Sequence, residues 1–194
     1  MELFSDENKN RNYFFDKLKD NTEISNLKCL IGKEIPVPYK NIYVPVRNTL
    51  EIWCFKQDIC IYQKLFDKTV DFKNIAITTN EKSLLKIDLE GALNEEDVGM
   101  PFVIIETKKS NTSTHELLAS SEKSKMIKSI FPYCKSFLLV FGSSPPPRIY
   151  RLCSGFDEIL FLDKFDDEMF EHSINKIIEA IKVAYSYLIS VVSC

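Results

Sequence analysis

The sequence predicts an α/β protein in which a mixed central sheet is flanked by helices. Short apolar runs typical of buried strands alternate with longer segments whose apolar residues recur at helical spacing. The chain has 194 residues, 45% of them hydrophobic, with 14 Phe and only 5 Gly, which suits one packed domain. We expect a single domain over 1–194, with its core at about 47–142, an accessory segment at 1–46 and a C-terminal extension at 147–194.

The first third of the chain is expected to be mainly helical. Residues 6–20 are polar with interspersed aromatic and apolar side chains, as in a short amphipathic helix. Pro36 and Pro38 then break the chain. Segment 47–66 carries apolar residues at spacings compatible with a helix, and the β-rich composition of 52–55 makes a strand the competing prediction.

The middle of the chain is expected to complete the sheet. Its apolar runs have strand length and are bounded by turn residues, while one longer segment follows a polar connector and is stopped by Pro132. We expect strands at 74–79 and 83–89, a strand through 101–106, a helix at 115–131 and a strand at 136–141.

The C-terminal extension is expected to add peripheral elements. Segments 149–153 and 158–162 have the composition of strands near a sheet edge, and 166–192 has apolar residues at helical spacing. The core order is therefore helix, three strands, helix, strand. The broad apolar face of the last helix makes it a candidate contact for a homodimer.

Composition limits the function classes. The net charge is −3, so nothing in the overall charge favours a polyanion partner, and any nucleic-acid surface must be local. Six cysteines without a Cys-x-x-Cys pair, and only 2 histidines, argue against a zinc finger. The N-terminus does not resemble a secretory signal, so we expect reduced thiols and an intracellular location, in the cytoplasm, nucleus or nucleoid. The apolar stretch 183–192 is too short to span a bilayer, and no membrane contact is expected.

The most informative motif is Glu106-Thr107-Lys108, at the end of an apolar strand. Alternate side chains of a strand share a face, so Glu106 and Lys108 point the same way and Thr107 points to the other side. Asp88 stands at the end of the preceding strand-like segment, and a hairpin would bring it alongside. Two carboxylates and a lysine suit metal-dependent phosphodiester cleavage. Taken alone, the motif is equally compatible with a solvated strand end.

The element order and these residues resemble the PD-(D/E)XK nuclease superfamily of restriction-endonuclease-like proteins, over roughly 47–142. The resemblance implies a core of helix, three strands, helix and strand, with catalytic residues at Glu51 on the first helix, Asp88 on the second strand, and Glu106 and Lys108 on the third. The sequence departs from the motif in having Ile87 where many members have proline.

The chemistry expected at this site is hydrolysis assisted by Mg²⁺, for which Mn²⁺ can substitute. Mg²⁺ prefers hard oxygen ligands and keeps several waters, so Asp88, Glu106 and the backbone carbonyl of Thr107 are the expected metal ligands. Lys108 is expected to orient or deprotonate the attacking water and to offset charge on the phosphate. Burial and neighbouring carboxylates should act on its pKa in opposite directions.

The expected substrate is DNA, which makes the protein a Mg²⁺-dependent endodeoxyribonuclease. An RNA-directed nuclease, an inactive module of the same fold that binds nucleic acid or protein, and a subunit of a larger nuclease complex remain alternatives. Phosphate contacts are expected from basic residues beside the motif and on the following helix, although a solvated helix face explains the latter equally well. These residues are Lys109, Lys123, Lys125 and Lys128.

Overall fold

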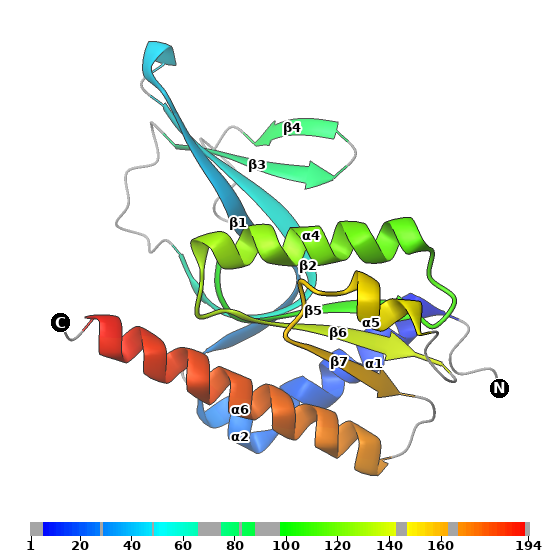
Figure 1. Ribbon diagram of the computed structural model, residues 1–194. Helices are drawn as coiled ribbons and strands as arrows, with labels where there is room; N and C mark the ends of the chain where they lie inside the picture. Colours follow the sequence, from blue (N-terminus) through cyan, green and yellow to red (C-terminus); the bar gives the residue numbers. More distant parts are fainter. Residues whose placement is uncertain are drawn as a thin grey trace.

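The structure, a computed structural model, describes residues 6–27, 29–47, 49–65, 75–81, 83–87, 98–142, 147–162 and 167–192. Within these residues the chain forms a seven-stranded mixed sheet with helices on both faces (Figure 1). The predicted class, an α/β protein with a mixed sheet flanked by helices, is confirmed. No helix in the described ranges combines the length and apolar character needed to cross a lipid bilayer.

The elements follow one another along the chain as labelled in Figure 1. They are α1 (Glu7–Lys19), α2 (Thr22–Asn26), β1 (Leu30–Val44), the 3-10 turn η1 (Pro45–Arg47), β2 (Thr49–Lys64), β3 (Ile75–Glu81), β4 (Ser83–Ile87), β5 (Gly99–Lys109), α4 (Thr114–Ile130), β6 (Lys135–Phe141), α5 (Arg148–Leu152), β7 (Glu158–Leu162) and α6 (Asp167–Val192).

The helix expected at 47–66 is wrong, because this segment forms the long strand β2. Its β-branched and aromatic side chains suit a strand with neighbours on both edges. On one edge β2 pairs with β1, a strand that was not expected because of Pro36 and Pro38. In the described residues β1 pairs only with β2, and an edge strand tolerates residues that lack an N–H donor.

The strand expected at 149–153 is also wrong, because 148–152 forms the short helix α5. Ile149 and Cys153, four residues apart, are both buried against Leu138 and Val140 of β6. That spacing puts two side chains on one side of a helix, and burial of this pair explains the local structure. The other expected helices and strands are present, within a few residues of their expected bounds.

The sheet order is β4-β3-β2-β5-β6-β7, with β1 on the other edge of β2. The two halves of β2 have different neighbours on the edge away from β1. Residues 50–54 pair in parallel with β3, whereas 59–64 pair antiparallel with β5. No pair with β3 or β5 falls on 55–58, so β2 leaves β5 at this point. The end of β5 continues beside β6 alone, and an edge of the sheet opens there.

Helices bury the two faces of the sheet. On one face, Phe14 and Leu18 of α1 and the apolar side of α6 pack against Ile59, Ile105 and their neighbours. On the other face α4 covers β1, β2 and β5, and α5 covers β6. The N-terminal turns of α1 and the first half of α4 thus lie on opposite sides of the open edge at β5. The predicted homodimer contact through α6 stays a prediction.

A polar network anchors α4 to the loop before β7. Ser113 caps the helix in a reciprocal capping box with Glu116. The hydroxyl of Ser121 accepts a hydrogen bond from the Gly155 amide at 2.8 Å, and the hydroxyl of Ser124 donates to the Gly155 carbonyl at 3.0 Å. A side chain at position 155 would overlap the backbone carbonyl of Ser121. Only glycine therefore fits against the helix here.

Replacing Gly155 by alanine is expected to destabilise the protein. Because the new methyl group meets backbone rather than a movable side chain, we expect the free energy of unfolding to fall by about 1–3 kcal/mol, as in other overpacked sites. Denaturant unfolding followed by circular dichroism measures the change. Ser154→Ala, at the exposed neighbouring position, is the matched control. Equal stability of Gly155→Ala and the wild type would contradict this packing.

Candidate active site

Glu106 and Lys108 meet at the end of β5, as the alternation of strand side chains predicts. Lys108 Nζ lies 2.8 Å from Glu106 Oε1. The hydroxyl of Ser120, on α4, donates a hydrogen bond to the same oxygen at 2.7 Å. The side chains of Glu106 and Lys108 are only 12% and 15% exposed. This ion pair is thus largely shielded from solvent, unlike a strand-end pair on an open surface.

Glu7 joins this pair from α1. Its Oε1 lies 3.7 Å from Lys108 Nζ. The helix begins here because the Asp6 side chain accepts hydrogen bonds from the amides of Asn8 and Lys9. A glutamate in the first turn is also favoured by the helix dipole. The local sequence therefore fixes both the start of α1 and the position of the Glu7 carboxylate.

Asp58 contributes a third carboxylate from β2. Ile59 pairs with Ile105 in the antiparallel ladder, so the next positions outward are Asp58 and Glu106, on adjacent strands. Asp58 Oδ2 accepts hydrogen bonds from the amide and the hydroxyl of Thr107, each at 2.7 Å. These bonds satisfy the Thr107 amide where β2 leaves β5. Glu7, Asp58, Glu106 and Lys108 form what we call the carboxylate–lysine cluster.

The cluster keeps Lys108 in its charged form. Burial lowers the pKa of Lys108, but the charge and hydrogen bond of Glu106, together with the charges of Asp58 and Glu7, raise it above its ordinary value. Lys108 is therefore an ammonium ion at neutral pH. Of its two expected roles, orienting the water and stabilising negative charge fit this state, whereas accepting a proton does not.

Glu7 has the opposite balance. Burial raises the pKa of Glu7 above its usual value; Lys108 lowers it in part, and the negative charges of Asp58 and Glu106 raise it further. A carboxylate with a raised pKa is a better proton acceptor than an ordinary glutamate. Glu7 is thus the member of the cluster best suited to take a proton from water.

Two of the site residues expected from the sequence are not found in the cluster. Asp88 lies outside the described residues; β4, which precedes it, pairs with β3 and is not a neighbour of β5. Glu51 was expected at a helix start, but it lies on β2 opposite Ala76 of β3. It is seven residues from Asp58, roughly 23 Å along an extended strand. Glu51 does not reach Glu106 at that separation.

The lysines expected to contact phosphate have partners within the protein. On α4, Lys128 Nζ lies 3.0 Å from Asp157 Oδ2, and Lys125 Nζ lies 2.7 Å from Glu122. Lys123 Nζ lies 5.5 Å from the centre of the Phe55 ring. Lys109, next to the motif, is partly exposed, and its charge acts on Glu7. A nucleic-acid role for these four lysines stays a prediction.

Sequence reasoning missed Glu7 and Asp58 for different reasons. Glu7 was placed in an accessory helix, since nothing in the sequence shows that α1 docks at the end of β5. Asp58 directly precedes the apolar run 59–62, the mirror image of Glu106 directly following 101–105. Had 47–66 been assigned as a strand, this symmetry would have pointed to an antiparallel pair with the two acids side by side.

The donor set suits a hard divalent cation. In the described part of the chain, no three His, Cys, Asp or Glu side chains are grouped as a metal cage. Mg²⁺ needs only one or two carboxylates, because it keeps several waters and takes further oxygens from a phosphate substrate. Asp58 and Glu106 can supply these oxygens, and neither a thiol nor an imidazole belongs to the cluster, as a zinc site would favour.

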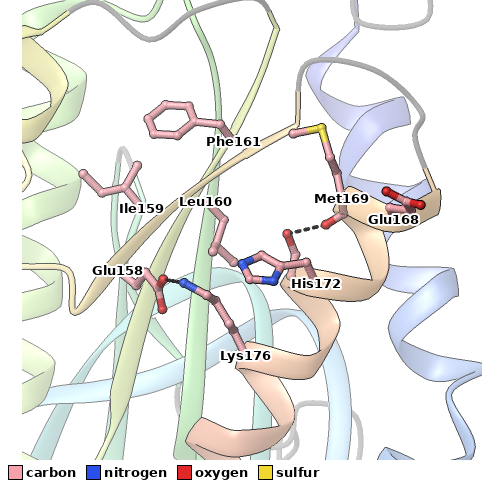
Figure 2. A pocket seen from close by; sticks show the side chains of 9 residues that line it. Glu158, Ile159, Leu160, Phe161, Glu168, Met169, His172 and Lys176 are labelled. Carbon is pink, nitrogen blue, oxygen red and sulfur yellow. Dashed lines mark hydrogen bonds and ion pairs between the residues drawn. The ribbon is translucent and has the colours of Figure 1, made fainter.

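A separate depression lies between β7 and the first turns of α6, with a volume of about 490 Å³ (Figure 2). It is two strands away from β5 in the sheet order, and none of its lining residues belongs to the carboxylate–lysine cluster. The lining comprises Glu158, Ile159, Leu160, Phe161, Glu168, Met169, His172, Ser173 and Lys176.

Comparisons with protein-family models and with curated proteins give no match for this chain. Its functional assignment therefore rests on the geometry of the cluster and on the residue pattern.

Proposed function

We propose that this protein is a Mg²⁺-dependent endonuclease that hydrolyses phosphodiester bonds of DNA, with Asp58, Glu106, Lys108 and Glu7 as its catalytic residues. The single observation that carries the proposal is the convergence of these residues from β2, β5 and α1 at an open edge of the sheet.

The arrangement of elements supports a core of the PD-(D/E)XK type. The order helix, three strands, helix, strand is met by α1, β1, β2, β5, α4 and β6, with the hairpin β3–β4 inserted before the third strand. Asp58 takes the place of the second-strand acid and Glu7 that of the first-helix acid. The core then spans about 7–141 instead of 47–142.

Each residue has a role that follows from its surroundings. Asp58 and Glu106 provide the carboxylate oxygens that would hold the metal ion, with Thr107 orienting Asp58. When bound, the ion would polarise the phosphate and lower the pKa of water. Lys108, held as an ammonium ion, places a positive charge where negative charge builds on the phosphate. Glu7 accepts the proton of the attacking water.

The test is cleavage of supercoiled plasmid DNA and of labelled DNA and RNA oligonucleotides by the purified protein. We expect DNA cleavage with Mg²⁺ or Mn²⁺ and none after chelation with EDTA, since the carboxylates alone supply no cation to neutralise the phosphate. Preferential cleavage of the RNA oligonucleotide would assign the same site to an RNA-directed nuclease. A protein that cleaves neither substrate with either metal would contradict the proposal.

One observation favours a second function, an inactive module of the same fold that binds nucleic acid or protein. Both site carboxylates already have cationic partners, Lys108 for Glu106 and Arg11 for Asp58. Calorimetry with Mn²⁺ separates the two functions, because a nuclease must bind the ion in competition with these partners. Absence of Mn²⁺ binding would favour the module.

A further inference from the structure

Arg11, on α1, holds the side of Asp58 that Thr107 leaves free. Its Nη1 lies 3.0 Å from Asp58 Oδ1 and 2.5 Å from Glu34 Oε1, and its Nη2 donates to Asn8 Oδ1 at 3.1 Å. The side chains of Arg11 and Asp58 are each only 19% exposed. This contact is therefore screened less than an ion pair on an open surface.

The contacts of Asp58 leave one direction for a further ligand. A carboxylate has about four acceptor positions, two on each oxygen. Oδ2 uses both of its positions for the Thr107 amide and hydroxyl, and Oδ1 uses one for Arg11. One position on Oδ1 remains. The residues around Asp58 thus orient it for a single bond to a cation rather than for bidentate binding.

Local conformational costs gather at the same place. Glu34 has a φ of 55°, a left-handed conformation that non-glycine residues rarely adopt. It lies between Lys33 and Ile35, which pair with Ile59 and Gln57, so its register position is that of Asp58. Backbone strain of this kind persists where the surroundings over-determine it, often at functional sites.

Two polar groups on the adjacent turn of α1 add to this cost. Arg11 Nε and both amide atoms of Asn10 are buried and find no hydrogen-bond partner among the described residues. An arginine chosen for stability alone would not leave Nε unsatisfied beside a strained Glu34. The cost is better explained if the Nη1 contact with Asp58 serves the site.

We propose that Arg11, supported by Glu34, is the positioning residue of Asp58 and determines how Asp58 presents its carboxylate to the catalytic cation. This rests on the proposed phosphodiesterase function. Arg11 touches neither Glu106 nor Lys108 in the contacts that the structure records, so it acts on the reaction through Asp58. Glu34 holds the guanidinium from the opposite side.

The effect of removing Arg11 distinguishes positioning from simple charge. Arg11→Ala makes the site one unit more negative, which by Coulomb's law favours a divalent cation. We therefore expect Mn²⁺ affinity, measured by calorimetry, to be maintained or increased. In contrast, kcat is expected to fall about 10–100-fold, as when the partner that orients a metal ligand is lost. Arg11→Lys keeps the charge but not the planar fork, so it is expected to recover part of kcat.

A second readout needs no catalysis. Thr107 donates its amide to Asp58, so a misplaced Asp58 should expose that amide. In the metal-free Arg11→Ala protein we expect hydrogen exchange of the Thr107 amide, followed by NMR, to accelerate about tenfold, while Val103 on the same strand keeps its rate. Arg148→Ala, which removes an arginine bonded to the Thr112 carbonyl, is the matched control and should change neither readout.

The proposal requires both effects. An unchanged kcat, or an unchanged exchange rate at Thr107, in a folded Arg11→Ala protein overturns it. If that variant does not fold, Glu34→Gln, which removes the charge holding Arg11 from behind, replaces it with the same expected directions. If the wild-type protein cleaves no nucleic acid, the proposed function fails, and Thr107 exchange alone decides whether Arg11 positions Asp58.

Discussion

Replacing Lys108 by alanine is expected to reduce metal-dependent DNA cleavage by about 10²–10³-fold in kcat, the typical cost of removing one preorganised donor at a developing charge. The ammonium group lies 2.8 Å from Glu106 and 3.7 Å from Glu7, and the cluster holds it protonated. Neither carboxylate can replace its positive charge beside the phosphate. Plasmid cleavage under single-turnover conditions measures the loss.

Stability must be measured beside activity in this variant. Lys108→Ala leaves the Glu106 carboxylate without its cation, but Ser120 still donates to Oε1, so we expect a folded protein with a lower melting temperature. Lys125→Ala is the matched control, because Lys125 forms an exposed ion pair with Glu122 on α4, and such pairs contribute little. Full activity of Lys108→Ala would remove this lysine from the mechanism.

The contribution of sequence reasoning differs between the two halves of the site. Glu106, Thr107 and Lys108 lie within one strand, where the alternation of side chains alone predicts which residues share a face. Their placement beside α4 also follows from a local pattern, since Ser113 and Pro132 mark the ends of that helix. Such features depend on residues near one another in the sequence and were predictable.

The other half depends on which strands become neighbours. Three segments before β5 have strand-like composition, β2, β3 and β4, and any of them would carry an acid towards Glu106 if it lay beside β5. The short hairpin at 75–87 has the clearer local signal, yet β2 is the neighbour. Its length lets it bury Ile59 and Ile61 against α1 and α6 while its other half pairs with β3. This gain in burial arises only in the folded protein.

The docking of α1 is equally non-local. Phe14 and Leu18 are fully buried beneath the sheet, and their burial sets the direction in which the helix axis runs. Glu7 and Arg11 lie one and two turns earlier on the same side of the helix and are thereby carried to the open edge at β5. A segment that reads as an accessory helix in the sequence thus contributes two charged residues to the site.

The acid of the second core strand can be identified by comparing Asp58→Asn with Asp88→Asn. Asparagine keeps the shape of Asp58 but loses the negative charge and sets its amide group, a donor, against either Arg11 or Thr107. A unit charge about 4 Å from a divalent ion contributes several kcal/mol at intermediate screening. We therefore expect the Mn²⁺ affinity of Asp58→Asn, measured by calorimetry, to fall at least about tenfold, with loss of cleavage.

Asp88→Asn is the matched control, because it makes the same chemical change at the position that the sequence motif indicates. If Asp58 holds the cation, Asp88→Asn retains both Mn²⁺ binding and cleavage. The reverse pattern, with binding lost in Asp88→Asn and kept in Asp58→Asn, would return the role to Asp88 and leave Asp58 as the residue that satisfies the Thr107 amide where β2 and β5 separate. Loss of binding in both variants would mean that the two acids share one cation.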